Sequence, residues 1–240
     1  MSTVTTHTAT TSPRPGGKAQ RSDGIEARNR LLNCALRLFS EKGFAKTSTR
    51  EIALAAEANI AAISYYFGDK AGLYRAVFTE PLGSPRDDIP LYDQPHFSLR
   101  QSLDGFYASF LEPMKQSELV QQCMRLHFRE MLEPTGLWQH ELEQGIKPAH
   151  LALVGILVRH LQLAQADDDV HRLAFAITAL ALQMYVGRDV VDAIAPQLVS
   201  SPPAIDQTAR RLADFAQAMV AAEHKRRLKA APLPKLRKKP

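Results

Sequence analysis

The chain has 240 residues and little of what marks secreted, membrane-spanning or disulfide-stabilised proteins. It has two cysteines, Cys34 and Cys123, which are far apart and each lie among apolar residues at helical spacing. This setting favours buried thiols over a disulfide. No run approaches the roughly 18 apolar residues that a membrane span needs. The Thr-rich segment 1–12 also lacks the apolar stretch of a signal peptide. These absences predict a cytoplasmic protein with no membrane partner.

Recognisable catalytic patterns are lacking as well. We find no nucleophile elbow, no phosphate-binding glycine loop and no pair of carboxylates in a catalytic setting. His127 and Glu130 could form half of a metal site, but no second pair with ligand spacing accompanies them. We therefore expect no catalytic residues, no bound metal and no cofactor.

Charge is unevenly distributed along the chain. Residues 1–80 carry 11 Lys/Arg against 7 Asp/Glu, residues 81–222 carry 11 against 17, and residues 223–240 carry 8 against 1. A basic beginning, an acidic middle and a basic end suggest that one part of the protein binds a polyanion. Ordinary solvated surface charge explains an imbalance of this size equally well.

The N-terminal third shows a succession of helix signals. Residues 1–24 are rich in Thr, Ser, Pro and Gly and are expected to be a disordered arm. From Ile25, apolar residues recur at helical spacing until Gly43. Ser48 and Glu51 then form a capping box, and helices over 60–67 and 70–80 follow Asn59 and Asp69 as N-caps. Four helices so close together, two of them very short, predict a compact unit over 25–80.

The rest of the chain is predicted to be helical too, without the alternating pattern of strands. Residues 81–96 are rich in Pro, Asp and Gly and are predicted to be a linker. Helices are then expected at 98–115, 118–133, 137–144, 148–165, 168–194 and 206–228, before a basic tail over 229–240. We therefore predict an all-α protein with a three-helix N-terminal domain, which contains a helix-turn-helix, and a helical bundle over 97–228.

The predicted helix 168–194 is apolar around most of its circumference and must be covered on several sides. With the helix 206–228 it could pair with its own copy in a second subunit, since two-fold homodimers are the commonest oligomers. The alternative is a helix central to the core of one monomer. The pattern favours the homodimer.

Three motifs in the N-terminal part have defined spacing. They are Ala35-x-x-Leu38-Phe39-x-x-x-Gly43-Phe44, Thr47-Ser48-x-Arg50-Glu51-Ile52-Ala53 and Ala62-Ile63-Ser64-Tyr65-Tyr66-Phe67-x-x-Lys70-x-x-Leu73. Over this stretch the chain resembles the TetR family of bacterial transcriptional regulators. The segment Arg129-Glu130-Met131-Leu132-Glu133-Pro134-Thr135 resembles the ligand-binding domain of the CerR/CecR-like subgroup.

The resemblance implies a homodimer that binds a double-stranded DNA operator, with the helix over 60–67 in the major groove. The implied DNA contacts are Thr47, Ser48, Arg50, Asn59, Ala61, Ala62, Ser64, Tyr65 and Lys70. Hydroxyl groups, helix N-termini and a lysine suit phosphates, and the short alanines permit close approach to thymine methyls. Arg50 could read a guanine or hold a phosphate. Ile60 suits either core packing or a thymine contact.

Three positions depart from the usual family pattern. Glu57 stands where a turn glycine is usual, Ala58 where a valine is usual, and Ser64 where a tyrosine is usual. Glu57 is expected to need a positive φ in the turn, at a cost of about 1 kcal/mol for a residue other than glycine. The motif survives these changes, although one phosphate contact then depends on Tyr65 in place of residue 64.

The resemblance also implies a small-molecule effector in the C-terminal bundle. Candidate pocket residues are Arg125, His127, Glu130, Gln183 and Met184. Each has a structural alternative. For Arg125, His127 and Glu130 it is a surface or interhelical ion pair. For Gln183 it is a hydrogen bond to the backbone, and for Met184 it is ordinary core packing. We predict a repressor that its effector releases from DNA. The alternatives are a helical DNA-binding protein without an effector, and a helical scaffold or enzyme that does not bind DNA.

Overall fold

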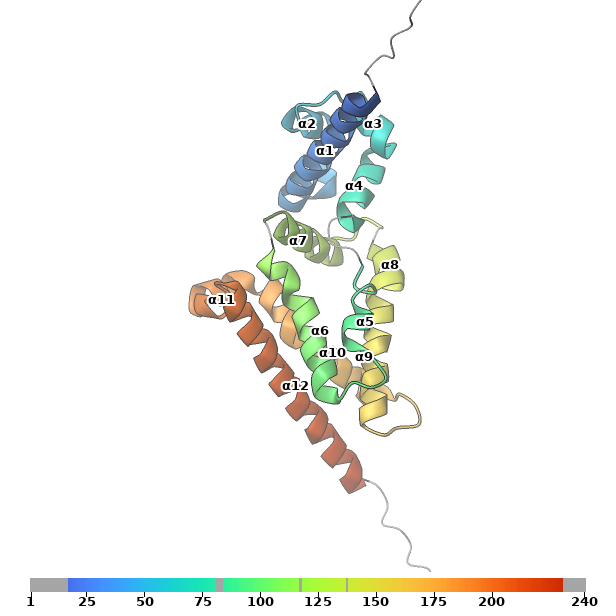
Figure 1. Cartoon of the computed structure of the whole chain (residues 1–240), viewed down its shortest axis with the longest axis vertical. Helices are drawn as coiled ribbons and strands as arrows, with labels where there is room; N and C mark the ends of the chain where they lie inside the picture. The colour runs from blue at the N-terminus through green and yellow to red at the C-terminus, as the bar shows by residue number, and fades with distance from the viewer. Residues whose placement is uncertain (1–16, 81–83, 117, 137, 231–240) are drawn as a thin grey trace, which may run out of the picture.

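The computed structural model describes residues 17–80, 84–116, 118–136 and 138–230, and Figure 1 shows that these residues are helical, as predicted. The first four helices form one end of an elongated molecule and the remaining helices form the rest. The helices are α1 (Gly17–Lys46), α2 (Thr49–Ala55), α3 (Ala61–Phe67), α4 (Lys70–Thr79), α5 (Ile89–Tyr92), α6 (Leu99–Leu111), α7 (Glu118–Leu132), α8 (Trp138–Glu141), α9 (Lys147–His160), α10 (Asp168–Val186), α11 (Arg188–Ile194) and α12 (Pro202–Ala230).

The N-terminal helix starts earlier than the composition suggests. Because α1 begins at Gly17, the prediction of a disordered arm is wrong for residues 17–24, and residues 1–16 lie outside the described part. At its other end α1 is interrupted at Gly43, where φ is 79°. This left-handed conformation favours glycine and explains why the helix was predicted to stop there. Thr47 is buried, and its hydroxyl donates to the carbonyl oxygens of Gly43 (2.9 Å) and Leu38 (3.2 Å).

Local capping sets the positions of the three short helices. Ser48 Oγ accepts from Glu51 N (3.1 Å), but the Glu51 carboxylate pairs with Lys42, so only half of the predicted capping box forms. Asn59 Oδ1 accepts from Ala61 N (2.9 Å), and Asp69 Oδ1 accepts from Gly72 N (2.6 Å). These bonds satisfy N–H groups that would have no partner within their helices.

Glu57 joins α2 to α3 with φ at 49°, as its position in the family pattern predicted. The residue is exposed, so its side chain contributes little packing to offset the conformational cost.

The predicted linker is partly structured. Residues 81–83 lie outside the described part, but α5 forms within the segment, and Tyr92 is buried with its ring edge-on to Phe106 at 5.4 Å. The prediction missed this helix because its single turn is too short to show a periodic pattern. The segment from Ser84 onward therefore contributes to the C-terminal core.

Two predicted helix boundaries in the C-terminal part are wrong. The break expected over 145–148 is a π-helical turn (Leu142–Ile146) that joins α8 to α9, and Lys147 N donates to Leu142 O, five residues earlier. Conversely, the predicted helix 168–194 is broken at Gly187, and α10 and α11 are bent by 72°. The Gln183 side chain occupies the space that a Cβ of residue 187 would need. In the described part no single helix is long and apolar enough to cross a membrane, and the bent pair α10–α11 meets that test by length and composition alone.

The other predicted boundaries differ by up to five residues. A 3-10 turn (Glu112–Lys115) ends the helix expected at 98–115, α9 stops at His160 where residue 165 was expected, and α12 starts four residues before the expected position. Proline in the first turn of α12 is favourable because that position has no helical partner for an N–H. Residues 231–240 of the predicted basic tail lie outside the described part. Both cysteines are free, as predicted; Cys123 is buried, whereas Cys34 is half-buried where a buried thiol was expected.

The core of the N-terminal helices is completed by a helix from the other part of the chain. Cys123 and Leu126 of α7 are fully buried in the same apolar cluster as Leu31 and Phe39 of α1. A second, larger cluster fills the space between α6, α9, α10 and α12. Burial raises the pKa of the Cys123 thiol to about 12, so it stays protonated and unreactive at neutral pH.

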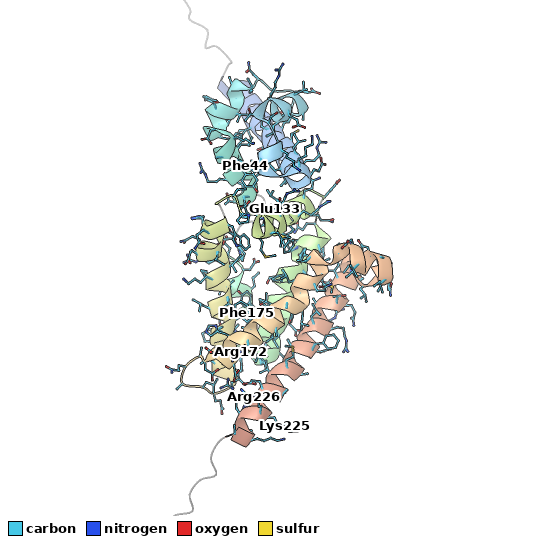
Figure 2. The ribbon with its side chains drawn as sticks, turned by 180° about the vertical axis from the view of Figure 1, so that it is seen from behind. Phe44, Glu133, Arg172, Phe175, Lys225 and Arg226 are labelled. Carbon is cyan, nitrogen blue, oxygen red and sulfur yellow. The ribbon has the colours of Figure 1, made fainter. Side chains whose placement is uncertain are left out.

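A buried hydrogen-bond network ties α4 to α7. Glu130 is 1% exposed and Tyr74 is 2% exposed, and the Tyr74 hydroxyl donates to Glu130 Oε2 at 2.7 Å. Thr135 N (2.6 Å) and Thr135 Oγ1 (2.8 Å) donate to the other carboxylate oxygen. Burial raises the pKa of Tyr74, and the Glu130 carboxylate raises it further. Figure 2 shows Phe44 and Glu133 at this junction between the two parts.

The strained turn predicts a stabilising substitution. Glu57→Gly should raise the free energy of unfolding by about 1 kcal/mol, because glycine adopts a positive φ without steric cost. Glu57→Ala keeps the strain and is the control. Urea unfolding followed by circular dichroism measures both, and equal stability of the two variants would contradict the strain.

The α4–α7 network predicts a loss of stability when one donor is removed. Tyr74→Phe should lower the free energy of unfolding by about 1.5–3 kcal/mol, because it removes a hydrogen bond to a buried charged group. Tyr65→Phe removes a hydroxyl from a side chain that is 82% exposed, and it should change stability by less than about 0.5 kcal/mol. If the two substitutions had the same effect on urea unfolding, the network would not hold the two parts together.

Candidate DNA-binding surface and effector site

The α3 helix has one side in the core and one side in solvent. Ile63 is buried and Phe67 packs against the N-terminal core with the Arg28 guanidinium 5.0 Å from its ring centre. Asn59, Ala61, Ser64 and Tyr65 are exposed, and Tyr65 also contacts the Tyr66 ring edge-on at 4.9 Å. Ile63 and Phe67 thus hold α3 on the core, and most of the predicted α3 contacts lie on its exposed side.

A surface hollow of about 400 Å³ brings several of these outward residues together. Its lining joins the start of α2, the outer side of α3 and the start of α4, and comprises Thr49, Ile60, Ala61, Ile63, Ser64, Gly68, Asp69 and Lys70. Ile60 is about half exposed, which excludes core packing as its main role. Thr49 was missed from the sequence, although its place directly after the Ser48 N-cap puts it at the positive end of α2.

Basic and hydroxyl groups border this surface. Ser48 and Arg50 are exposed at the start of α2. The Lys70 ammonium lies 4.4 Å from the centre of the Phe44 ring, and Phe44 itself contacts Tyr74 at 4.9 Å. The Asp69 carboxylate in the same hollow accepts a hydrogen bond from Gly72 N and so caps the start of α4.

Two of the predicted DNA contacts have a different role in the structure. Thr47 is buried and its hydroxyl is used by the end of α1, so the prediction of a direct side-chain contact to DNA is wrong. Ala62 is half-buried against the N-terminal core, and only part of its methyl group faces outward. In both cases the side chain that the motif assigned to DNA is packed in the N-terminal core instead.

The predicted effector residues do not share one environment. Arg125 and Gln183 are exposed, which removes the expectation that Gln183 needs a buried hydrogen-bond partner. Glu130 has three hydrogen bonds from Tyr74 and Thr135, so it acts as an interhelical tie, the structural alternative for this position. Met184 packs against the C-terminal core.

His127 lies between α7 and α4. Its ring stacks on Phe78 at 3.9 Å, and its Nδ1 is 3.0 Å from the Cys123 carbonyl oxygen. Burial lowers the pKa of His127, so the imidazole is neutral at physiological pH. The ring is therefore held between α7 and α4 by stacking and by its contact with the Cys123 carbonyl oxygen.

Sequence reasoning missed two features near this junction. Phe110, Phe128 and Tyr185 form an aromatic cluster that joins α6, α7 and α10, and the Tyr185 hydroxyl donates to Phe110 O at 2.8 Å. Glu141 is a buried carboxylate at the end of α8. The sequence around Glu141 does not distinguish this buried carboxylate from the exposed charged residues beside it. Its burial is seen only in the structure, where it directly precedes the π-helical turn.

Exposed apolar side chains cover the outer side of the last three helices. They are Phe175 on α10, Val190 and Ile194 on α11, and Phe215 on α12. Beside them a hollow of about 410 Å³ lies between α10 and α12, lined by Asp169, Arg172, Leu173, Met219, Ala222, Glu223 and Arg226. Figure 2 shows Arg172, Phe175 and Arg226 along this side of the molecule.

Comparison with known proteins agrees with this architecture. Residues 31–77 match the family of bacterial regulatory proteins called the tetR family, and residues 99–222 match the C-terminal domain of the HTH-type transcriptional dual regulator CecR. CecR from Shigella flexneri is 32% identical over 179 residues, which are 70% of this chain and 79% of that protein. The probable HTH-type transcriptional regulator YttP from Bacillus subtilis is 43% identical over 56 residues, which are 23% of this chain and 27% of YttP.

Solved structures show the same fold. The SmeT–triclosan complex has a TM-score of 0.59 with this chain and 18% identity, over 80% of this chain and 90% of SmeT. NalD, the secondary repressor of the MexAB-OprM multidrug efflux pump in Pseudomonas aeruginosa, has a TM-score of 0.55 and 18% identity, over 82% of this chain and 98% of NalD. The matched domains and the identity to CecR show that the chain belongs to the TetR family of bacterial transcriptional regulators, with a C-terminal domain of the CecR type.

Proposed function

We propose that this protein is a homodimeric repressor that binds operator DNA in the cytoplasm through residues 25–80 and is released by a small-molecule effector bound within residues 97–228. The observation that carries the proposal is the outer side of α3. There Asn59, Ala61, Ser64 and Tyr65 are exposed while Ile63 anchors the helix in the core. A helix held by one side and free on the other is what insertion into the major groove requires.

The chemistry around α3 suits a DNA backbone. Two helix N-termini, those of α2 and α4, border the same hollow and carry partial positive charge. Lys70 adds a full charge, and the Ser48, Thr49 and Ser64 hydroxyls can donate to phosphate oxygens. Arg50 and Tyr65 are exposed beside them and have the reach to contact a base edge or a phosphate.

A route from the effector to DNA runs through α7. This helix contributes Cys123 and Leu126 to the core around α1 and α4, and its Glu130 accepts a hydrogen bond from Tyr74 of α4. On its other side Phe128 contacts Tyr185 of α10. A ligand that binds one position of α7 more tightly than another would therefore change the position of α4 and the spacing of two α3 helices in a dimer. In a fold relative, SmeT, the bound small molecule is triclosan.

The homodimer is proposed from the exposed apolar side chains of α10, α11 and α12. Ile194 is 78% exposed, and Phe175, Val190 and Phe215 are about half exposed or more. Exposed apolar side chains grouped on neighbouring helices are typical of an interaction site. A two-fold dimer would bury it against its own copy and would set two α3 helices at a fixed separation on a palindromic operator.

DNA binding is tested with a fluorescent fragment from just upstream of the protein's own gene, with anisotropy measured over a range of salt. We expect specific binding that weakens steeply with salt, and Lys70→Ala should reduce the salt slope by about 1 because one phosphate contact is lost. Arg50→Ala should weaken binding by about tenfold or more. Lys147→Ala is the control, since it removes one charge from α9, which lies far from α3 in Figure 1. Absence of binding at low salt would contradict the proposal.

The dimer is tested by adding charge to its proposed interface. Phe175→Glu combined with Ile194→Glu should give a monomer in sedimentation analysis, because the two-fold axis places each new charge in the interface twice. Loss of bivalent binding should then weaken operator affinity by about a hundredfold or more. Leu151→Glu changes an exposed leucine on α9 and should leave both properties unchanged. A dimer that survives the double substitution would place the interface elsewhere.

A further inference from the structure

Glu141 is a buried carboxylate with an unmet hydrogen-bonding requirement. The residue is 8% exposed, and its Oε1 atom receives no hydrogen bond from the residues that the structure describes. Buried charged groups of this kind carry a desolvation cost unless a donor or a cation meets them. By contrast Glu130, on the neighbouring helix, has three donors.

The backbone beside Glu141 is shaped to bring two oxygen atoms close to one point. The π-helical turn begins at the next residue, and such turns often occur at functional sites. A Cβ added to Gly145 would lie 2.5 Å from Glu141 Oε1 and 3.1 Å from Ser84 Oγ. Glu141 Oε1 thus packs so closely against Gly145 that only glycine fits at this position. The Ser84 hydroxyl oxygen, from a different segment of the chain, lies near the same point.

Two basic residues on the neighbouring helices pair with other acids. Arg129 of α7 lies 3.3 Å from Glu133, and Lys147 of α9 lies 2.9 Å from Glu143. Burial raises the pKa of Glu141 above its ordinary value, and the charge of nearby His140 opposes that shift. The Glu141 carboxyl group therefore has no ion-pair partner among the residues that the structure describes.

We propose that Glu141 and the Ser84 hydroxyl form the recognition point for a ligand that carries a protonated amine, and that such amines are the effector class of this regulator. The inference rests on the proposed function for its regulatory meaning. An ammonium group donates hydrogen bonds and charge, which are what a carboxylate and a hydroxyl oxygen accept. Trp138 lies three residues before Glu141 on α8.

The position of Glu141 explains how an amine would reach the DNA-binding helices. The carboxylate is close enough to Cys123 to raise the pKa of that thiol. Cys123 Sγ in turn lies 3.7 Å from the carbonyl oxygen of Val77 on α4. Trp138 itself packs against the N-terminal core. A ligand at Glu141 therefore acts where α4, α7 and α8 meet, and a preference for one arrangement of these helices is transmitted directly to α4.

The experiment compares benzylamine, which is protonated at neutral pH, with its neutral counterpart benzyl alcohol and with benzoate. Thermal unfolding of the full chain and release of fluorescent operator DNA are measured with each compound. In the wild type we expect benzylamine to raise the unfolding temperature and to release DNA, and the alcohol and the acid to do neither. Glu141→Gln keeps the shape and removes the charge, and should weaken the response to benzylamine by about tenfold or more.

Matched variants separate recognition from folding. Gly145→Ala places a methyl group against the carboxylate and should also remove the benzylamine response, whereas Gly155→Ala on α9, where an added Cβ meets nothing within 4 Å, should retain it. Glu143→Gln removes an exposed carboxylate of the same π-helical turn and is the control for charge. Without any compound, Glu141→Gln should unfold at a temperature no lower than the wild type, because a buried charge has been removed.

The outcomes distinguish this inference from the proposed function. Equal responses to benzylamine and benzyl alcohol, no response to benzylamine, or a full benzylamine response in Glu141→Gln would each overturn the amine site while leaving DNA binding intact. A thermal response that depends on Glu141 in a protein that does not bind operator DNA would support the amine site and reject its role as a repressor's effector site.

Discussion

A buried hydrogen bond between Tyr74 and Glu130 joins the two parts of the chain. It joins α4, which supports α3, to α7, which belongs by sequence to the C-terminal part. Both side chains are nearly fully buried, so the bond cannot be exchanged for one to water without opening the junction. The same carboxylate also fixes the turn after α7 through Thr135. Three segments from two parts of the chain therefore share one acceptor.

The two parts of the chain share helix α7. The N-terminal helices form a compact unit, yet their core is closed by Cys123 and Leu126 of α7. A helix that is buried in one core and also contacts α10 of the other cannot move without affecting both. This arrangement differs from a DNA-binding domain on a flexible linker, because any displacement of α7 is carried to both parts by packed side chains.

The DNA-binding surface shows how strongly a motif constrains local structure. The caps at Ser48, Asn59 and Asp69 and the positive φ of Glu57 depend on neighbouring residues, so they could be predicted from the chain itself. Thr47 is the exception within the motif, because its hydroxyl bonds to the carbonyl groups of Gly43 and Leu38 and the side chain is buried, which the motif alone does not indicate. The candidate effector residues were placed less well, since Gln183 and Arg125 lie at helical spacing that says nothing about which neighbour covers them.

The sequence by itself determined the all-α class, the positions of the short N-terminal helices and the side of α3 that faces outward, because these follow from capping, periodicity and turn conformation within a few residues. Only the tertiary structure decided that Glu130 is a tie between helices, that Glu141 is buried beside a π-helical turn, and that α10 bends into α11 at Gly187. These features depend on atoms supplied by segments far away in the chain, or on a backbone conformation that packing selects. For that reason, neither composition nor spacing could specify them.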